Sequence, residues 1–429
     1  MKYEVTELTL KGGARGLIVN VADAPVMSTQ FQFHAGSRFV KDWRTKWETA
    51  HIMEHMAFGA NDEFDTAAAY DAEFTKNGAY HNAFTSDNAM CYVATCADFE
   101  WDRILDLQRL AICRPKFTDD EFTSEYGNVK AELTGYLSQA DWVLWPKLGQ
   151  SFGEDTVTIA ESLDLMPGIT VDDIREHHRR THTAGNLRFV IAGNFNGRMT
   201  KLKELLKKWE LPAGERLPIP MEELHSFDPL VIRRKDVPSI TLAWNMRLPR
   251  RLSDAENEAM DALNQILNGT LHSRIQGAAR TRGLAYYVWS KTAVAEHRSS
   301  WEFGTEATAD NLGKVIDLVV KELTKIQNGE ITDAEIDEAK SYALGRHQMG
   351  IQTASQLNDW LASWYFFDGQ IRDFTAEPQR IKAIARERII DTAREFFAAD
   401  CWGMGIYGNT GKATADILGE KLAKLFKKI

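Results

Sequence analysis

The chain has 429 residues, of which 44% are hydrophobic and 26% are charged, a composition typical of folded globular proteins rather than disordered or fibrous ones. Its formal net charge of -10 argues against a nucleic-acid-binding protein, because such proteins carry a basic face that neutralises phosphates. The length exceeds what one ordinary hydrophobic core needs, so we expect roughly two or three domains.

The amino-terminal run MKYEVTELTLKGG lacks the apolar segment of a signal peptide. The sequence also holds no stretch of about 18 uninterrupted apolar residues that would span a bilayer. The four cysteines form no CxxC pair and no regular framework, so we expect them to be reduced residues of the core. These features predict a cytoplasmic protein that does not enter a membrane.

The first half of the chain mixes strands and helices. Residues 26–36, VMSTQFQFHAG, alternate apolar and polar side chains, which is the period of a strand with one buried face. A helical pattern begins near Trp47. Residues 82–96, NAFTSDNAMCYVATC, read as two strands joined by the turn-like SDN, and residues 99–114, FEWDRILDLQRLAICR, as an amphipathic helix.

Two similar strands indicate an internal duplication. One strand is predicted in NLRFVIAGNF and ends at Gly193, and the other is predicted in CWGMGIYGNT and ends at Gly408. The two glycines are 215 residues apart (408 minus 193), which is half the length of the chain. Between them LPAGERLPIP, with three prolines and a glycine, has the composition of a linker. We therefore predict an α+β fold of two homologous domains, each a mainly antiparallel sheet packed with helices. The predicted ranges are 1–210 and 223–429, joined by a linker at 211–222.

The motif HIMEH near the start of the chain is the first candidate site. Positions i, i+3 and i+4 share one face of a helix, so His51, Glu54 and His55 project together. Two imidazoles can hold one zinc ion, and a carboxylate beside them can act as a general base. The same letters also occur on ordinary surface helices. Here the apolar neighbours of the motif indicate a buried helix, where imidazoles and carboxylates need partners.

The second half cannot hold the same site. When ETAHIMEHMAFG is laid on EAMDALNQILNG, the two histidine positions become Asp261 and Gln265. A metal site is therefore expected only in the first half.

HIMEH and the later segment EYGNVKAELTGYL resemble the pitrilysin-type inverzincin peptidases, the group that includes insulin-degrading enzyme and mitochondrial processing peptidase. In that family the third zinc ligand is a glutamate on a second helix, and Glu132, which lies 77 residues after His55 (132 minus 55), matches it. The resemblance thus implies Zn²⁺ bound by His51, His55 and Glu132. It also implies that Glu125, two helical turns before Glu132, helps to orient the site.

Two further segments resemble the substrate-binding parts of the same family. GAYHNAFTSDNAMCYV is similar to a segment whose strand edge accepts the substrate backbone, which implies substrate contacts at Asn82 and Ala83. The neighbouring His81 is interpreted as a simple polar residue rather than a ligand.

In the second half, LHSRIQGAARTRGLAYYVWS resembles a run in which an arginine and a tyrosine bind the substrate carbonyl. Arg280 is the arginine. The family spacing of seven residues selects Tyr287, whereas the run RGLAYYV selects Tyr286, and we choose Tyr286.

The resemblance implies a zinc endopeptidase that hydrolyses short, unfolded peptides inside a closed chamber, with Glu54 activating a zinc-bound water. Large members of the family close four such domains around the chamber, so a two-domain chain is half of a clamshell. We expect a homodimer, and a heterodimer with a zinc-free homologue is the alternative. The rival function is that of a non-catalytic or partner-dependent subunit of a heterodimeric processing peptidase.

Overall fold

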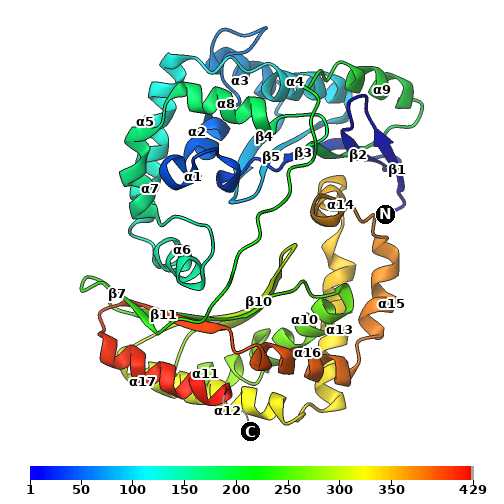
Figure 1. Ribbon diagram of the computed structural model, residues 1–429. Coiled ribbons are helices and arrows are strands. Elements are labelled where there is room, and N and C mark those ends of the chain that lie inside the picture. Colours follow the sequence, from blue (N-terminus) through cyan, green and yellow to red (C-terminus); the bar gives the residue numbers. More distant parts are fainter. Residues whose placement is uncertain (427–429) are drawn as a thin grey trace. The chain divides into compact units, whose positions relative to one another are not determined.

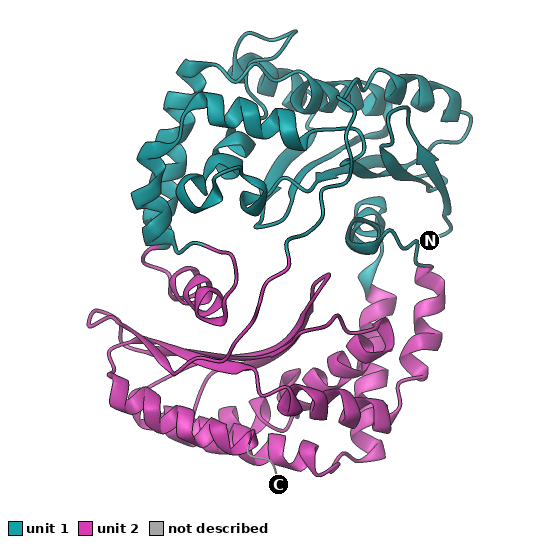
Figure 2. Cartoon of the chain, in the orientation of Figure 1, with its two compact units in different colours: residues 1–136, 157–220, 350–372 teal, residues 137–156, 221–349, 373–429 magenta. Residues whose placement is uncertain are grey.

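The computed structural model describes residues 1–426, and Figure 1 shows the order of their helices and strands. The chain divides into two compact units (Figure 2). Unit 1 comprises residues 1–136, 157–220 and 350–372, and unit 2 comprises residues 137–156, 221–349 and those from 373 onward. These units are not the contiguous ranges 1–210 and 223–429, because each half contributes one segment to the other unit. The predicted boundaries, which concern homologous repeats, stay a prediction.

Unit 1 is built on a six-stranded sheet with the order β1-β2-β6-β3-β5-β4. Neighbouring strands are antiparallel except for the parallel pair β2 and β6, and β4 forms one edge. The strands are β1 (Glu4–Thr9), β2 (Arg15–Asn20), β3 (Val26–Phe33), β4 (Tyr80–Thr85), β5 (Met90–Ala97) and β6 (Arg188–Gly193). The strand predicted at 26–36 is confirmed as β3, where Phe31 and Phe33 are fully buried as their alternation requires.

The helices of unit 1 include one that comes from the second half of the chain. They are α1 (Trp43–Lys46), α2 (Thr49–Met56), α3 (Ala67–Thr75), α4 (Trp101–Cys113), α5 (Asp119–Tyr136), α7 (Ile159–Leu165), α8 (Val171–Thr181), α9 (Met199–Lys207) and α14 (Ala354–Asp368). Helix α14 packs across β3 and β6, and its Leu357 and Leu361 join the core beside Leu17. The Asn358 amide donates hydrogen bonds to the carbonyl oxygens of Ser28 (2.8 Å) and Val190 (3.1 Å), which fixes the helix on the sheet.

Unit 2 repeats the topology of unit 1. Its five-stranded sheet has the order β7-β11-β8-β10-β9, in which only β7 and β11 are parallel. That is the order and direction of β2-β6-β3-β5-β4 in unit 1. The strands are β7 (Leu230–Arg233), β8 (Ile240–Leu248), β9 (Val288–Val294), β10 (Ser299–Ala307) and β11 (Trp402–Gly408). The prediction of an α+β fold with two related, mainly antiparallel sheets is confirmed.

Helices cover both faces of this second sheet. They are α6 (Ala140–Phe152), α10 (Asp254–Asn268), α11 (Gln276–Thr281), α12 (Ala309–Gln327), α13 (Asp333–Gly350), α15 (Glu377–Lys382), α16 (Arg386–Ala398) and α17 (Lys412–Leu422). Alternate residues of β8 point to opposite faces, so Leu242 and Trp244 join the main core with α10, α12 and α16. Ala243 points the other way and packs against Leu144 and Leu148 of α6.

An ionic network around the buried Arg247 links Glu154, just after α6, to the sheet of unit 2. The Arg247 guanidinium lies 2.9 Å from the Glu154 carboxylate and 3.6 Å from that of Glu302. Lys291 lies 3.2 Å from Glu302, and Arg298 lies 3.4 Å from Glu154. These charges offset one another, which is the condition for burying them.

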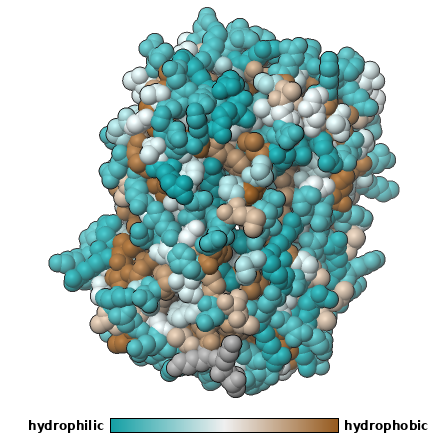
Figure 3. Space-filling view, in the orientation of Figure 1, coloured by the Kyte–Doolittle hydropathy of each residue, from teal (hydrophilic) through white to brown (hydrophobic). Residues whose placement is uncertain are grey.

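The four cysteines are free, and Cys91 and Cys96 are buried as predicted, whereas Cys113 and Cys401 are only partly buried. The face seen in Figure 3 is mainly hydrophilic with scattered hydrophobic residues. Across residues 1–426, we find no helix with both the length and the apolar character needed to cross a membrane.

Candidate metal centre

Helix α2 presents the HIMEH side chains from a buried position. Ile52, Met53 and Met56 are at most 1% exposed and hold the helix in the core. His51 and His55 project from another part of the helix surface, with 19% and 24% of their side chains exposed. The imidazoles are therefore reachable from solvent while the backbone that carries them is fixed.

Glu132 on α5 faces both imidazoles. Its Oε2 atom lies 3.8 Å from Nε2 of His51 and 3.4 Å from Nε2 of His55. One donor atom from each of these three residues lies within 4.8 Å of the other two. A tetrahedral ion with bonds of about 2.1 Å places its ligand atoms about 3.4 Å apart, so this spacing fits one zinc ion.

Each imidazole is held through its other nitrogen by a second carboxylate. Nδ1 of His51 lies 2.9 Å from Glu48, and Nδ1 of His55 lies 3.2 Å from Glu125. Such contacts fix the ring orientation and leave Nε2 free to bind a metal, which is the usual arrangement of zinc-binding histidines. Sequence reasoning missed Glu48, although its position three residues before His51 places it on the same helical face.

Glu132 is itself oriented by its own helix. The Tyr136 hydroxyl donates a hydrogen bond to Glu132 Oε1, which leaves Oε2 for the imidazoles. The Glu132 carboxylate in turn raises the pKa of Tyr136 to about 12. Tyr136 was also missed, and its position four residues after Glu132 was the available signal.

The centre has a surplus of negative charge. Among residues 1–426, no lysine or arginine pairs with the four carboxylates of the centre, which are Glu48, Glu54, Glu125 and Glu132. Burial raises the pKa of the Glu54 carboxyl above its ordinary value. Burial acts to lower the pKa of His51, but the hydrogen bond and charge of Glu48 outweigh it and raise that pKa. A divalent cation would offset this surplus, so the donor set fits zinc in charge as well as in spacing.

The predicted substrate edge lies beside the ligand helix. Within residues 1–426, strand β4 pairs with β5 alone, through Asn82 opposite Val93 and Ala83 opposite Tyr92, so its other edge has no strand beside it. Asn82 is exposed and Ala83 is 4% exposed. Helix α2 packs against β4, which places this open edge next to the metal-binding helix. His81 is outside the three-residue cluster, and its Nε2 lies 2.9 Å from Asp71.

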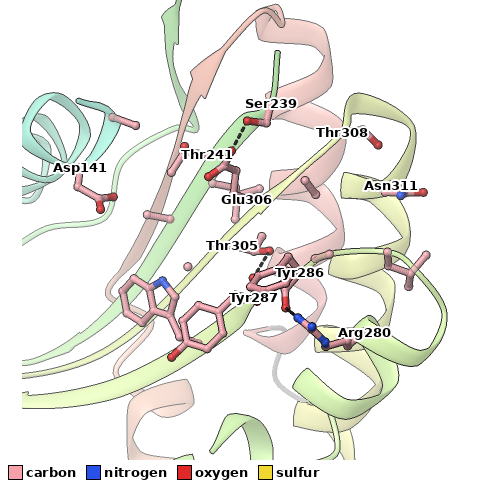
Figure 4. A pocket seen from close by; sticks show the side chains of 18 of the residues that line it. Asp141, Ser239, Thr241, Arg280, Tyr286, Tyr287, Thr305, Glu306, Thr308 and Asn311 are labelled. Atoms are coloured by element: carbon pink, nitrogen blue, oxygen red, sulfur yellow. Dashed lines mark hydrogen bonds between the residues drawn. The ribbon is translucent and has the colours of Figure 1, made fainter. Parts of the chain in front are cut away.

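Arg280 and Tyr286 lie together in unit 2. The Arg280 guanidinium stacks 4.0 Å from the Tyr286 ring centroid, and its Nη1 donates a hydrogen bond of 3.2 Å to the Tyr286 carbonyl. The Tyr287 carbonyl instead accepts a hydrogen bond of 3.0 Å from Thr305. The structure thus joins Arg280 to Tyr286, and both line a cavity of about 900 Å³ (Figure 4).

Comparisons with known proteins identify the family to which the chain is similar. A family model described as Insulinase (Peptidase family M16) matches residues 17–152, and one described as Peptidase M16 inactive domain matches residues 168–342. The uncharacterized zinc protease YmxG of Bacillus subtilis is 21% identical over 358 residues, which cover 82% of this chain and 86% of that protein. The zinc protease PqqE of Helicobacter pylori is 22% identical over 407 residues, which cover 91% of this chain and 89% of that protein.

The fold also matches a solved structure. The crystal structure of a protease from Helicobacter pylori superposes with a TM-score of 0.81 at 21% identity, covering 95% of this chain and 100% of that chain. The two family models follow one another along the chain, and the first contains His51, His55 and Glu132. The chain belongs to the M16 family of peptidases, with the two-domain organisation of its bacterial relatives.

Proposed function

We propose that the protein is a zinc-dependent endopeptidase that hydrolyses short, unfolded peptides. The observation that carries the proposal is the meeting of His51, His55 and Glu132, whose donor atoms lie within 4.8 Å of one another. The names of the relatives, which are zinc proteases, support the metal and the reaction class.

The number of protein ligands, which is three, is typical of a catalytic zinc site and not of a structural one. Three protein ligands with an open position is the usual catalytic pattern, whereas structural sites are closed by four. When bound there, zinc supplies a Lewis acid that polarises a carbonyl group and lowers the pKa of water to about 7.

The roles of the protein's own groups follow from their positions. Glu54 shares a helix with both imidazoles, and its carboxylate takes the proton of the attacking water and then gives it to the leaving amine. Burial raises its pKa, which brings it closer to the range in which one group can do both. Asn82 and Ala83 bind the substrate backbone along the open edge of β4. Arg280 and Tyr286 donate to the substrate carbonyl, a role carried by resemblance.

The assembly is proposed on the resemblance alone. We propose a homodimer, since this chain carries both the zinc ligands and the Arg280 and Tyr286 pair. A heterodimer with a zinc-free homologue is the alternative, and sedimentation of the purified protein separates either form from an active monomer. The cytoplasmic location stays a prediction.

The second candidate is a non-catalytic or partner-dependent subunit. The match to an inactive-domain model favours it at first sight, but that match covers residues 168–342, which contain none of the three ligands. The presence of Glu54 beside a complete ligand set favours the enzyme, because a subunit without catalysis has no need for a general base.

The experiment is cleavage of a mixed peptide pool by zinc-loaded protein, read by mass spectrometry. Glu54→Gln is the matched control, since it keeps the size of the side chain and leaves all three ligands in place. We expect equal zinc content in both proteins and cuts only by the unmodified one. Equal cleavage by the variant would remove Glu54 from the base role. Zinc-occupied protein that cuts nothing would favour the non-catalytic subunit.

A further inference from the structure

The cavity that Arg280 and Tyr286 line also contains aromatic rings and carboxylates to which the proposed reaction assigns no role. It lies entirely within unit 2, between α6 and the sheet, and has a volume of about 900 Å³. Its aromatic lining consists of Trp142, Trp145, Tyr286, Tyr287 and Trp289. The exposed fractions are 46% for Trp142, 78% for Tyr286 and 54% for Tyr287. Large ring surfaces are thus open to a ligand.

Two indoles form a fixed wall of this cavity. Trp289 lies flat on the backbone of β10, because a Cβ atom at Gly304 would come within 2.4 Å of its ring. The Trp145 ring lies beside it, with centroids 5.6 Å apart at 39°. Lys291 lies 5.6 Å from the Trp289 ring and is neutralised by Glu302 at 3.2 Å. The ammonium of Lys291 is therefore paired outside the cavity and not with its carboxylates, Asp141 and Glu306.

The charges of the cavity are separated. Glu306 extends from β10 beyond the last residue paired with β9, and the Ser239 hydroxyl donates a hydrogen bond to its carboxylate. Asp141 approaches from α6. Figure 4 shows Arg280 beside Tyr286, well apart from Glu306 and Ser239. Across residues 1–426, neither Glu306 nor Asp141 forms an ion pair.

We propose that this cavity binds a lysine or arginine side chain of the peptide substrate, with Glu306 as the acceptor of its charge. The inference rests on the proposed peptidase function and adds a substrate preference to it. Glu306 is exposed to solvent, and an ammonium or guanidinium group there adds charge-assisted hydrogen bonds to the one that its carboxylate accepts from Ser239. The methylene stem packs on the exposed rings, and the cation also gains from the ring faces. Arg280, at the other end, is placed for a carbonyl oxygen and repels a second cation.

The Ser239 hydroxyl has a positioning role in this scheme. Its hydrogen bond holds the Glu306 carboxylate beside the start of β8. A carboxylate held in this way loses less side-chain freedom when it binds a cation, so the contact favours tighter binding.

The test uses peptides with acetylated amino termini that differ only in having lysine, norleucine or glutamate at one position, which is moved along the sequence. We expect kcat/KM for the best lysine peptide to exceed that for its norleucine partner by about tenfold. Glu306→Gln keeps the size of the side chain and an acceptor for Ser239, and it should reduce the ratio to about one. Glu306→Lys should turn the preference toward glutamate.

Glu420→Gln is the matched control, because it removes an exposed carboxylate of unit 2 that is remote in sequence from the lining residues. It should leave every ratio unchanged. An equal lysine preference in the unmodified protein and in Glu306→Gln would overturn the proposal. The same peptides without the acetyl group are a further comparison. If a free amino terminus raises kcat/KM and lysine does not, the cavity binds the peptide amino group, and the proposal is overturned as well.

A binding measurement keeps this test separate from the proposed reaction. Glu54→Gln protein is titrated with the same peptides, and tryptophan fluorescence reports occupation of the cavity. If zinc-loaded protein cuts nothing, the peptidase proposal fails. The cavity assignment is still supported if Glu54→Gln protein binds lysine peptides more tightly than norleucine peptides and the double variant Glu54→Gln with Glu306→Gln does not. Cleavage without any preference for basic side chains overturns the cavity assignment and leaves the peptidase proposal intact.

Discussion

Replacing Tyr136 with phenylalanine removes one hydroxyl group from α5 and tests whether the Glu132 carboxylate is held in place for a metal. The hydroxyl donates to Oε1 of Glu132, and Oε2 is the atom that faces both imidazoles. Without this hydrogen bond the carboxylate can rotate about its terminal bond, so the ligand set has to be ordered when the metal binds. The ring remains, and the packing of α5 is kept.

The expected loss follows from the type of bond. A hydrogen bond to a charged group contributes about 1.5–3 kcal/mol, and removal of a partner that orients a metal ligand costs about 10 to 100-fold in metal affinity. Glu132 is about a third exposed, so solvent replaces part of the lost interaction. We therefore expect the zinc Kd of Tyr136→Phe to rise by about tenfold, at the lower end of that range.

The assay is competition for zinc with a chromophoric chelator near neutral pH, which reads affinity without any need for catalysis. Tyr126→Phe is the matched control, because it removes the same group from the same helix and the Tyr126 ring lies beside Phe122, with centroids 5.9 Å apart at a tilt of 51°. An unchanged Kd in Tyr136→Phe would refute the orienting role. An equal rise in both variants would show that general changes in α5, and not the hydrogen bond, weaken the site.

Three further predictions concern stability. Burial lowers the pKa values of His34, His177 and His178 from the ordinary 6.5 to about 4. Between these two values the unfolded chain binds more protons than the folded chain. The free energy of unfolding should therefore fall by roughly a few kcal/mol as the pH drops from 6.5 toward 4. Urea unfolding at pH 7 and pH 5 checks this, and equal midpoints would contradict it. Arg247→Met removes one of the two cations beside each of Glu154 and Glu302, and Arg298 and Lys291 remain, so urea unfolding should show a loss of about 2–3 kcal/mol, below the value for an uncompensated buried charge. A loss below about 1 kcal/mol would mean that the remaining cations and solvent replace Arg247. Gly304→Val displaces the indole that lies on it and should cost about 1–3 kcal/mol with a shift in tryptophan emission, and an unchanged emission spectrum would contradict that packing.

The sequence contained enough information for the ligands but not for the groups that hold them. His51 and His55 are four residues apart, and helical periodicity alone puts them on one face. Glu132 required the resemblance, since no local rule relates two helices 77 residues apart (132 minus 55). Glu48 and Tyr136 have helical spacings to ligands, but such spacings are common on every helix, and only the side-chain rotamers decide which of them form contacts.

The exchange of segments between the units was also beyond sequence reasoning. Helix α6 precedes the predicted linker, yet Leu144 and Leu148 pack on Ala243 of the second sheet. The apolar face of a helix identifies a need for burial without identifying the partner. Gly405 of β11 helps to determine where α6 packs, because a Cβ atom at this position would come within 2.8 Å of Leu144. The missing side chain lets α6 pack closely against the strand.

The difference between the two units is clearest at the position that matches Glu54. In the alignment of the two halves this position is Asn264 on α10. Its side chain accepts a hydrogen bond of 2.9 Å from the Trp301 indole and donates one of 3.0 Å to Thr292. A position proposed for proton transfer in unit 1 therefore fastens a helix to its sheet in unit 2. Among residues 1–426 the cluster of three metal-binding side chains lies in unit 1, and the sheet of unit 2 forms the same strand order from a helix without those ligands, so function is the better explanation of their presence in unit 1.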